Sequence, residues 1–458
     1  MQKNKSTILQ GPIFPALTKF AVPILFSLIL QALYGAVDLW MVGRFASSAD
    51  VSAVSTGSQT MMIVSGIVTG LSMGITVLLG VSVGEKNDRR SAAIIGTSVW
   101  IFAAIGLVLT AALLVTAPAL ATGLHAPAQA FEKTVRYIQI CGAGTVFVVG
   151  FNVLNGVFCG LGDSRTPLIF VTIACVTNIV GDYLLIDRFQ MGAQGAAIAT
   201  ITAQAVSVIC SLLMIRKILP FRMDRQALRP QGKIVFNVLR LGLPVALLRM
   251  CNEISYLVIL GFVNTLGVTA SSGVGIAEKL VMFILLTPTA YMSAISAFVA
   301  QNEGAGQKQR AKRSLWVGMA TAAVIGGAMA YLSVFHGDSL SMLFIQDAQV
   351  IAASAEFLKA TAIECFVLSL AYCYDGYFNG IEKTGFVMVQ GICAALLIRI
   401  PYAYFASRQA NPSLFNIGMA TALAAVFMLV VCSVYYALYC KREASTAHEQ
   451  TIRAELDD

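Results

Sequence analysis

The chain has 458 residues, of which 57% are hydrophobic and 12% are charged. Soluble domains average about 45–50% apolar and about 25% charged residues, so this composition excludes an ordinary soluble protein and indicates a membrane protein. The net charge of +8 does not call for a nucleic-acid partner, because the basic residues of membrane proteins gather in their cytoplasmic loops.

Apolar runs of about 20 residues, the length that crosses a bilayer as a helix, recur from one end of the chain to the other. We therefore predict an all-α membrane protein with twelve transmembrane helices. Their ranges are 15–42, 52–80, 92–117, 131–157, 166–187, 195–217, 235–264, 270–301, 314–335, 354–379, 386–406 and 416–440.

The distribution of basic residues predicts the orientation of these helices. An even number of spans places both termini on one side of the membrane. The tails and the loops on that side contain 22 of the 31 Lys and Arg residues, whereas the opposite loops and helix ends contain six. By the positive-inside rule, both termini are expected in the cytoplasm of a cell-membrane protein.

Cysteine and histidine give no sign of a metal site or of enzymatic chemistry. The ten cysteines lie in the apolar spans or at their ends, and no CxxC pair occurs. The three histidines, His125, His336 and His448, fall in predicted loops or in the tail. We expect no transition metal, no cofactor and no enzyme, since the spans contain no nucleophile–base set.

The two halves of the chain resemble each other. Asn155-Gly156 is matched by Asp375-Gly376, and other short matches follow in the same order at an offset near 220. Six spans per half give both halves the same orientation, so we predict a parallel repeat of two six-helix lobes. Such repeats often place a substrate path between the halves, although a channel or a purely structural duplication is also compatible. The predicted segments are the lobes 1–217 and 235–440, a cytoplasmic linker 218–234 and a cytoplasmic tail 441–458.

Charged residues inside the spans are functional candidates, because each costs roughly 2.5–3.5 kcal/mol at the centre of a bilayer. The first half has Asp38 and Asp182 and no base at that depth. The second half balances three acids with three bases, namely Glu253, Glu278 and Glu364 with Arg249, Lys279 and Arg399. The acids of the first half must therefore find a proton, Na⁺ or a cationic substrate.

The two acids of the first half are predicted to share one pocket. Each lies about one helix turn from the outer end of its span. Tyr34 precedes Asp38 by four residues and Asn178 precedes Asp182 by four, so each pair shares a helix face. Carboxylate and amide oxygens suit a hard cation, and two adjacent carboxylates favour sharing a proton. A static buried hydrogen-bond network is the alternative.

Several stretches resemble the MATE (multidrug and toxic compound extrusion) family. They are Gly11-Pro12 leading to Pro23, the run Val37 to Gly43, the run Asn155 to Pro167, the run Asn178 to Asp182, Leu243-Pro244, the turn Gln301 to Ala305, and Arg399 to Pro401. The resemblance covers about residues 12–440. It implies an H⁺- or Na⁺-coupled antiporter that exports amphipathic, often cationic compounds by alternating access between two six-helix lobes.

The resemblance also implies residue roles. A cation site in the first lobe corresponds here to Asp38, Asn178, Asp182 and Thr200. The supporting or cavity residues correspond to Tyr34, Tyr137, Asn152 and Glu253. Another branch of the family uses a second acid in span 10, but Leu368 stands near that position here. Lobe packing is the alternative role for Tyr137 and Asn152, and an intrahelical pair with Arg249 is the alternative for Glu253.

Partners and competing functions follow from the same residues. We expect small amphipathic molecules and the lipid bilayer as partners, no nucleic acid, and a monomer. The runner-up function is a flippase or exporter of a lipid-linked or other endogenous metabolite. That function favours several basic residues around the cavity to hold phosphate, and the first lobe has none at membrane depth. We also predict a structural ion pair between Glu364 and Arg399, whose depths in spans 10 and 11 are similar.

Overall fold

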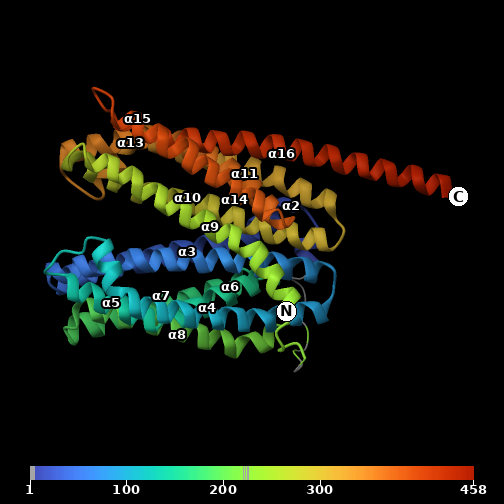
Figure 1. Cartoon of the computed structure of the whole chain (residues 1–458), viewed down its shortest axis with the longest axis horizontal. Helices are drawn as coiled ribbons and strands as arrows, with labels where there is room; N and C mark the ends of the chain where they lie inside the picture. The colour runs from blue at the N-terminus through green and yellow to red at the C-terminus, as the bar shows by residue number, and fades with distance from the viewer. Residues whose placement is uncertain (1–5, 220, 222, 224–225, 458) are drawn as a thin grey trace. The chain divides into compact units, whose positions relative to one another are not determined.

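The computed structural model describes residues 6–219, 221, 223 and 226–457, and these residues form helices joined by short turns, with no strand among them (Figure 1). The predicted all-α class is therefore confirmed. In chain order the elements are α1 (Ser6–Leu9), α2 (Ile13–Phe45), α3 (Ser48–Gly84), α4 (Asp88–Gly123), α5 (Phe131–Ala143), α6 (Thr145–Gly160), α7 (Arg165–Asp182), η2 (Tyr183–Arg188), α8 (Gly192–Ile218), α9 (Gly232–Asn264), α10 (Val268–Gly304), α11 (Lys308–Phe335), α12 (Gly337–Met342), α13 (Ala348–Gly380), α14 (Thr384–Cys393), η3 (Ala394–Arg399), α15 (Ile400–Ser407) and α16 (Leu414–Asp457).

Each predicted span corresponds to a helix or to a short run of joined helices. Among the described residues, ten spans are long and apolar enough to cross a membrane, and the bent pair of α5 and α6 forms an eleventh. The twelfth corresponds to α13, which has 33 residues. It is less apolar than the others because it contains Glu356, Lys359, Glu364 and Asp375. The chain is a multi-pass membrane protein.

The helices extend a few residues beyond the predicted apolar runs, because polar caps prolong them. The Ser47 and Asp50 side chains form a capping box at the start of α3. The largest difference is α16, which was predicted to end at 440 and continues to Asp457. The added segment has no Gly or Pro and is rich in good helix formers. Positions 220, 222, 224 and 225 of the predicted linker and position 458 of the predicted tail lie outside the described residues.

The predicted span 131–157 is broken at Gly144, where α5 and α6 meet at an angle of 48°. A Cβ atom at Gly144 would lie 2.6 Å from Cγ1 of Ile201 in α8, so the close approach of α8 requires glycine here. The Thr145 hydroxyl donates a 3.1 Å hydrogen bond to the carbonyl of Cys141 across the bend. The break therefore lets α8, which carries Thr200, pack against the fourth span.

The structure repeats itself along the chain, as the sequence matches predict. The helices α2 and α9 each contain 33 residues, and α3 and α10 each contain 37. In each half the fifth span contains a six-residue π-helix: η2 follows α7 and ends the span, and η3 follows α14 and leads into α15. Such wide turns are uncommon and frequently occur at functional sites.

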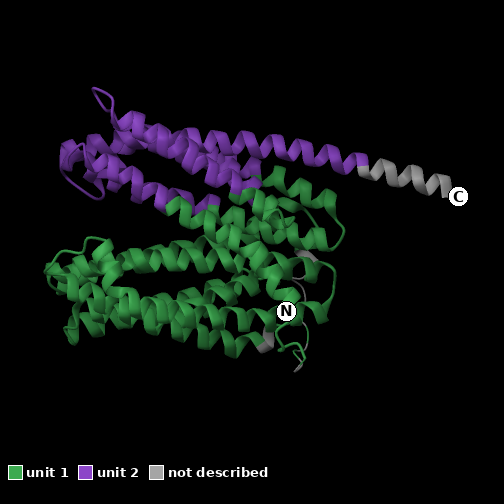
Figure 2. Ribbon diagram, in the orientation of Figure 1, with its two compact units in different colours: residues 1–253, 289–318, 376–388 green, residues 254–288, 319–375, 389–458 purple. Residues whose placement is uncertain are grey.

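Contacts divide the chain into two compact units (Figure 2). Unit 1 contains residues 1–253, 289–318 and 376–388, and unit 2 contains residues 254–288, 319–375 and 389–458. The core of unit 1 includes Val68, Ile75, Leu79, Ile94, Phe102 and Val238. The core of unit 2 includes Ile259, Val263, Val274, Phe357, Leu358 and Ile417. These units group residues by contact, so the lobe boundaries at 217 and 235 stay a prediction.

Small residues in α3 explain why unit 1 includes parts of α9 and α10. A Cβ atom added at Gly70 would lie 2.5 Å from Cα of Ala246 in α9. One added at Gly80 would lie 2.9 Å from Cβ of Ala300 in α10. Small residues let helix backbones approach closely, which is how helices associate in a lipid environment.

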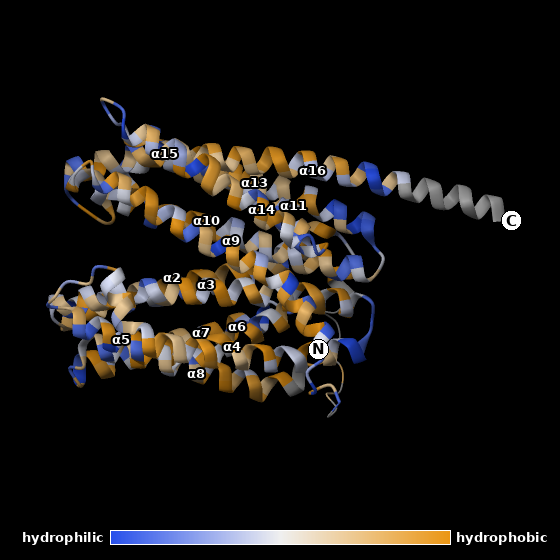
Figure 3. Cartoon of the chain, in the orientation of Figure 1, coloured by the Kyte–Doolittle hydropathy of each residue, from blue (hydrophilic) through white to orange (hydrophobic). Residues whose placement is uncertain are grey.

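Many large apolar side chains on the helices are exposed. Leu107, Leu213 and Leu397 are each at least two-thirds exposed. Figure 3 shows apolar residues along the lengths of the helices and polar residues at their ends and turns. Such extensive exposed apolar surface is avoided by soluble proteins and is favourable against lipid.

An ionic clamp at the N-terminal end of α3 holds the start of α8. Asp50 Oδ2 lies 2.7 Å from Nζ of Lys133 in α5, and Asp50 Oδ1 accepts a 3.1 Å hydrogen bond from the backbone N–H of Ala193. Gly192, at φ +55°, leaves room for the carboxylate. The clamp ties α3, α5 and α8 together and so sets the height of Thr200, about two turns into α8.

The glycine contacts of α3 predict a stability difference between two alanine variants. In Gly74→Ala the new Cβ would lie 2.9 Å from the backbone nitrogen of Gly242 and still closer to the Val238 carbonyl. We expect a loss of about 1–3 kcal/mol from overpacking, measured as a lower midpoint of thermal unfolding in detergent. Gly66→Ala in the same helix is the matched control, because that Cβ meets nothing within 4 Å. Equal midpoints for the two variants would contradict the packing described for α3.

Candidate functional site

Asp38 is buried in the C-terminal third of α2, with 6% of its surface exposed. Its Oδ2 accepts a 3.1 Å hydrogen bond from the hydroxyl of Thr200 in α8. Its Oδ1 is buried and accepts no hydrogen bond from the described residues. The carboxyl group is thus held in position by α8 but is not neutralised by a basic side chain.

Asn178 of α7 joins the same group of side chains. Its Nδ2 donates to the Thr200 hydroxyl at 3.5 Å, so Thr200 bridges Asn178 and Asp38. Asn178 is almost fully buried, and its Oδ1 has no hydrogen-bond partner among the described residues. Three helices, α2, α7 and α8, therefore meet at one polar site inside unit 1.

Asp182 is the most buried acid of this site, with an exposed fraction of 0%. Its carboxyl group interacts directly with that of Asp38. Neither of its oxygens accepts a hydrogen bond from a residue that the structure describes. Asp182 ends α7 just before the π-helix η2, and one helix turn earlier Asn178 shares its face. The structure thus brings together all four residues predicted for the cation site.

Four buried oxygen atoms of this site remain without a described partner: one of Asp38, one of Asn178 and both of Asp182. Two carboxylates in contact inside a protein repel each other unless a proton or a cation lies between them. Carboxylate and amide oxygens are also the ligands that hard cations prefer. The arrangement is therefore chemically suited to bind a proton or Na⁺, and it leaves the acids poorly satisfied without one.

Tyr34 and Gln204 form the next layer of the site. Gln204 Nε2 donates a 3.4 Å hydrogen bond to the Tyr34 hydroxyl, and its buried Oε1 has no partner among the described residues. The charge of Asp38 acts on Tyr34, which lies one turn before it in α2. Gln204 is not among the residues predicted from the sequence. Its position four residues after Thr200 in α8 was the available signal, since the two share a helix face.

The two other predicted supporting residues lie in different surroundings. Tyr137 is buried close enough to the acids for the charges of Asp38 and Asp182 to act on it. Asn152 is occupied in helix packing, because it accepts a 2.8 Å hydrogen bond from the Thr69 hydroxyl and donates a 2.9 Å bond to the carbonyl of Val148. The functional role of either residue stays a prediction.

Glu253 in α9 is exposed. The charge of Arg249, one turn earlier, acts on it, but the described ion pairs within 4 Å do not include these two residues. The tight intrahelical pair weighed from the sequence is therefore not formed. Its place as a cavity residue stays a prediction.

In unit 2, Glu364 and Arg399 meet at Tyr256. The Tyr256 hydroxyl donates a 3.1 Å hydrogen bond to Glu364 Oε1, and Cζ of Arg399 lies 4.9 Å from the centroid of the Tyr256 ring. All three groups are close enough for their charges to interact. Both of these contacts involve Tyr256. A direct ion pair between Glu364 and Arg399 stays a prediction.

Asp375 in α13 is buried as well, with 2% of its surface exposed. Gln390 Nε2 donates a 3.1 Å hydrogen bond to its Oδ1, and Cys432 Sγ lies 4.0 Å from the same oxygen. Gln390 was not foreseen as its partner, because the two residues lie on different helices.

The site of the first half has no counterpart in the second. The equal lengths of α2 and α9, the equal lengths of the fifth spans 165–188 and 384–407, and the starts of α8 and α16 place the halves in register. In that register the positions of Asp38, Asn178, Asp182 and Thr200 are occupied by Leu257, Leu397, Pro401 and Ala422. The fold is therefore duplicated while the acidic site is not.

The contacts of Glu364 predict how much folded protein different variants yield. Arg399→Ala should leave Glu364 buried without its nearby cation, which costs roughly 3–5 kcal/mol, and so should lower the yield of folded protein. Arg399→Ala combined with Glu364→Ala should recover part of the yield. Tyr256→Phe, which keeps the ring and removes the hydroxyl, should cost less than Arg399→Ala. A double variant with no better yield than Arg399→Ala would show that the two charges do not compensate each other.

Comparisons with known proteins agree with this architecture. The sequence matches the MatE family over residues 23–184 and 244–405, one match in each predicted lobe. The probable multidrug resistance protein YpnP of Bacillus subtilis is 25% identical over 429 residues, which cover 93% of this chain and 95% of that protein. An FAD transporter of Shewanella oneidensis is 24% identical over 412 residues, which cover 88% of this chain and 90% of that transporter.

The fold itself matches solved structures. A crystal structure of MATE in complex with MaL6 superimposes with a TM-score of 0.89 over 95% of this chain and 99% of that one, at 18% identity. The predicted all-α fold of twelve helices in two lobes is thereby confirmed. With both repeats matched by the family, the chain belongs to the MatE family, whose members are transporters.

Proposed function

We propose that the protein is an H⁺- or Na⁺-coupled antiporter that exports amphipathic, often cationic, drugs or toxic compounds by alternating access. The observation that carries the proposal is the buried contact between Asp38 and Asp182, whose free oxygens need a cation or a proton. The printed names of relatives support the substrate class, since YpnP is a probable multidrug resistance protein.

The site supports a simple exchange. A bound proton or Na⁺ offsets the charge of the two acids, which is costly at membrane depth. When the cation leaves, the carboxylates regain their charge and favour a positively charged compound in their place. Coupling to one charge moving across 100 mV supplies about 2.3 kcal/mol, which sustains a gradient of about fiftyfold.

The proposal also includes the location, the orientation and the partners of the protein. The charge asymmetry of the loops supports a cell-membrane protein with both termini in the cytoplasm. The expected partners are small amphipathic molecules and the lipid bilayer, and the expected assembly is a monomer. Tyr34 and Glu253 are proposed to line the substrate path.

An exporter of an endogenous metabolite is the second candidate, because one relative is an FAD transporter. FAD carries a pyrophosphate, which favours basic residues at the binding site. The acidic pair of Asp38 and Asp182 favours cations instead. Export of flavins that is unaffected by cationic compounds would favour the metabolite over the drug.

Neutralising either acid should abolish coupled export. We predict that Asp38→Asn and Asp182→Asn each insert normally and lose gradient-driven efflux of a fluorescent cation from vesicles, because the amide is nearly isosteric and does not bind the coupling ion. Asp187→Asn, five residues further along and paired only weakly with Arg188 at 4.0 Å, is the control and should retain efflux. Wild-type rates in the two site variants would reject the coupling role.

The driving force can be tested on the unmodified protein. Efflux should stop when both the proton and the Na⁺ gradient are collapsed, and the gradient that restores it identifies the coupling ion. Efflux that continues unchanged without either gradient would contradict antiport while leaving family membership intact.

The orientation can be tested with reporter fusions. Green fluorescent protein fused to the C terminus should fluoresce, because it remains in the cytoplasm. Alkaline phosphatase fused after Arg408, in the turn between α15 and α16, should be active, because an odd number of spans precedes it. An active phosphatase at the C terminus would overturn the topology.

A further inference from the structure

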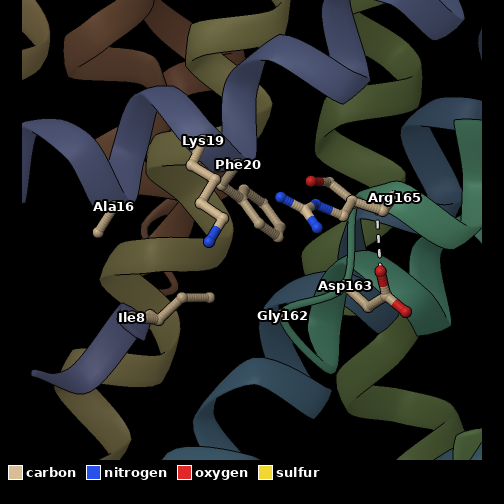
Figure 4. A pocket seen from close by; sticks show the side chains of 8 residues that line it. Ile8, Ala16, Lys19, Phe20, Gly162, Asp163 and Arg165 are labelled. Atoms are coloured by element: carbon tan, nitrogen blue, oxygen red, sulfur yellow. Dashed lines mark hydrogen bonds between the residues drawn. The ribbon is translucent and has the colours of Figure 1, made fainter. Parts of the chain in front are cut away.

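A pocket of about 40 Å³ lies in unit 1 where α1, the start of α2 and the turn between α6 and α7 come together (Figure 4). It is separate from the Asp38 site, which lies about five turns further along α2. Its lining is apolar on one side, with Ile8, Ala16 and Phe20. The volume exceeds the roughly 10–15 Å³ that one water requires, and it is far below the roughly 300–1,000 Å³ of pockets for drug-sized molecules.

Two cations reach this pocket. Lys19 extends from α2 and Arg165 from the first turn of α7, with the Phe20 ring between them in the view of Figure 4. Both side chains are exposed, and the described ion pairs include neither of them. The pocket therefore presents two positive charges that the described residues leave unpaired.

Asp163, the acidic residue that lines the pocket, already accepts hydrogen bonds from its neighbours. Asp163 Oδ1 accepts hydrogen bonds from the backbone N–H groups of Arg165 at 3.0 Å and Thr166 at 3.1 Å. Asp163 Oδ2 accepts a 2.6 Å hydrogen bond from the Thr166 hydroxyl. This carboxylate caps the start of α7 and is not directed to Lys19 or to the Arg165 guanidinium.

A serine also lines this pocket. Ser164 lines the pocket and is only 3% exposed, yet its side chain forms no hydrogen bond with the described residues. The hydroxyl is therefore available to donate a hydrogen bond to a ligand in the pocket. A free hydroxyl donor in a pocket that two cations also line favours an anionic ligand.

The walls of the pocket are held in place from outside it. The Arg310 guanidinium of α11 donates to the carbonyls of Ile8 at 3.1 Å, Gln10 at 3.2 Å and Gly11 at 2.7 Å, and so fixes the segment that carries Ile8. Gly162, at φ +82°, lies so close that an added Cβ would be 2.8 Å from Cδ1 of Ile8. The pocket is therefore preformed and not a gap between loose side chains.

We propose that this pocket binds a phosphate group, held by Lys19, Arg165 and the Ser164 hydroxyl. Arginine and lysine with a hydroxyl donor match the charge and oxygens of phosphate. The group can be presented by the headgroup of an anionic phospholipid or by a soluble phosphate. The apolar side with Ile8, Ala16 and Phe20 and the position at the ends of two membrane spans favour the lipid. The proposal does not depend on cation coupling at Asp38.

Lipid binding is the first test. Full-length protein in detergent is titrated with phosphatidylglycerol, and bound lipid is counted by native mass spectrometry. Each basic residue near a membrane surface contributes about a fivefold gain in affinity for anionic lipid. Lys19→Gln with Arg165→Gln should therefore weaken the tightest binding by about 25-fold. The control is Lys86→Gln with Arg89→Gln, which removes the same charge from exposed positions on the same predicted side and should change it little.

The second arm distinguishes the sources of phosphate. Inorganic phosphate and glycerol 3-phosphate are each added as competitors and followed by the midpoint of thermal unfolding. Stabilisation by phosphatidylglycerol alone assigns the pocket to lipid, and stabilisation by the soluble anions assigns it to a soluble phosphate. The proposal is overturned if neither binds, or if the Lys19/Arg165 variant and its control lose binding equally. Ser164→Ala should produce a smaller loss than the double variant, since one neutral donor is removed.

Discussion

The contact between two buried carboxyl groups, Asp38 and Asp182, is the constraint around which the first half of the protein is organised. A charged residue at the centre of a bilayer costs roughly 2.5–3.5 kcal/mol, and two in contact repel each other as well. The fold nevertheless holds them together. The bend at Gly144 admits α8, the Asp50 clamp sets the height of α8, and Thr200 then reaches both Asp38 and Asn178. A purely structural network would be expected to satisfy its own oxygens, and this one leaves four of them free.

The second half shows how the same fold accommodates acids without such a site. Glu364 accepts a hydrogen bond from the Tyr256 hydroxyl, and the Arg399 guanidinium lies over the Tyr256 ring. Asp375 accepts a hydrogen bond from the side-chain amide of Gln390. The positions that correspond to the site of the first half carry apolar side chains. The two halves therefore share a scaffold, and the buried pair of acids in contact lies in the first half, where the cation is proposed to act.

Much of the fold and the heart of the site follow from the sequence. Twelve spans are visible because each must be about 20 residues long and apolar. Asp38 and Asp182 stand out because charges are rare at that depth, and Asn178 is found by its spacing of four from Asp182. Gln204, Gln390 and the partner of Asp50 were missed, because a contact between helices leaves no periodic signal in either one. The break at Gly144 was also missed, since its cause is Ile201 in another helix. The continuation of α16 was missed because the span prediction follows hydropathy, whereas the helix continues on intrinsic propensity.

The central claim is that cation and substrate compete for the acids of the first half. It is tested most directly by adding a cationic fluorescent compound to purified protein in weakly buffered solution while a pH indicator and a sodium electrode record what is released. The account predicts that binding of the compound displaces protons or Na⁺ in a fixed ratio, and that Asp38→Asn with Asp182→Asn releases neither. Binding of the compound to the wild-type protein with no release of either ion would contradict it.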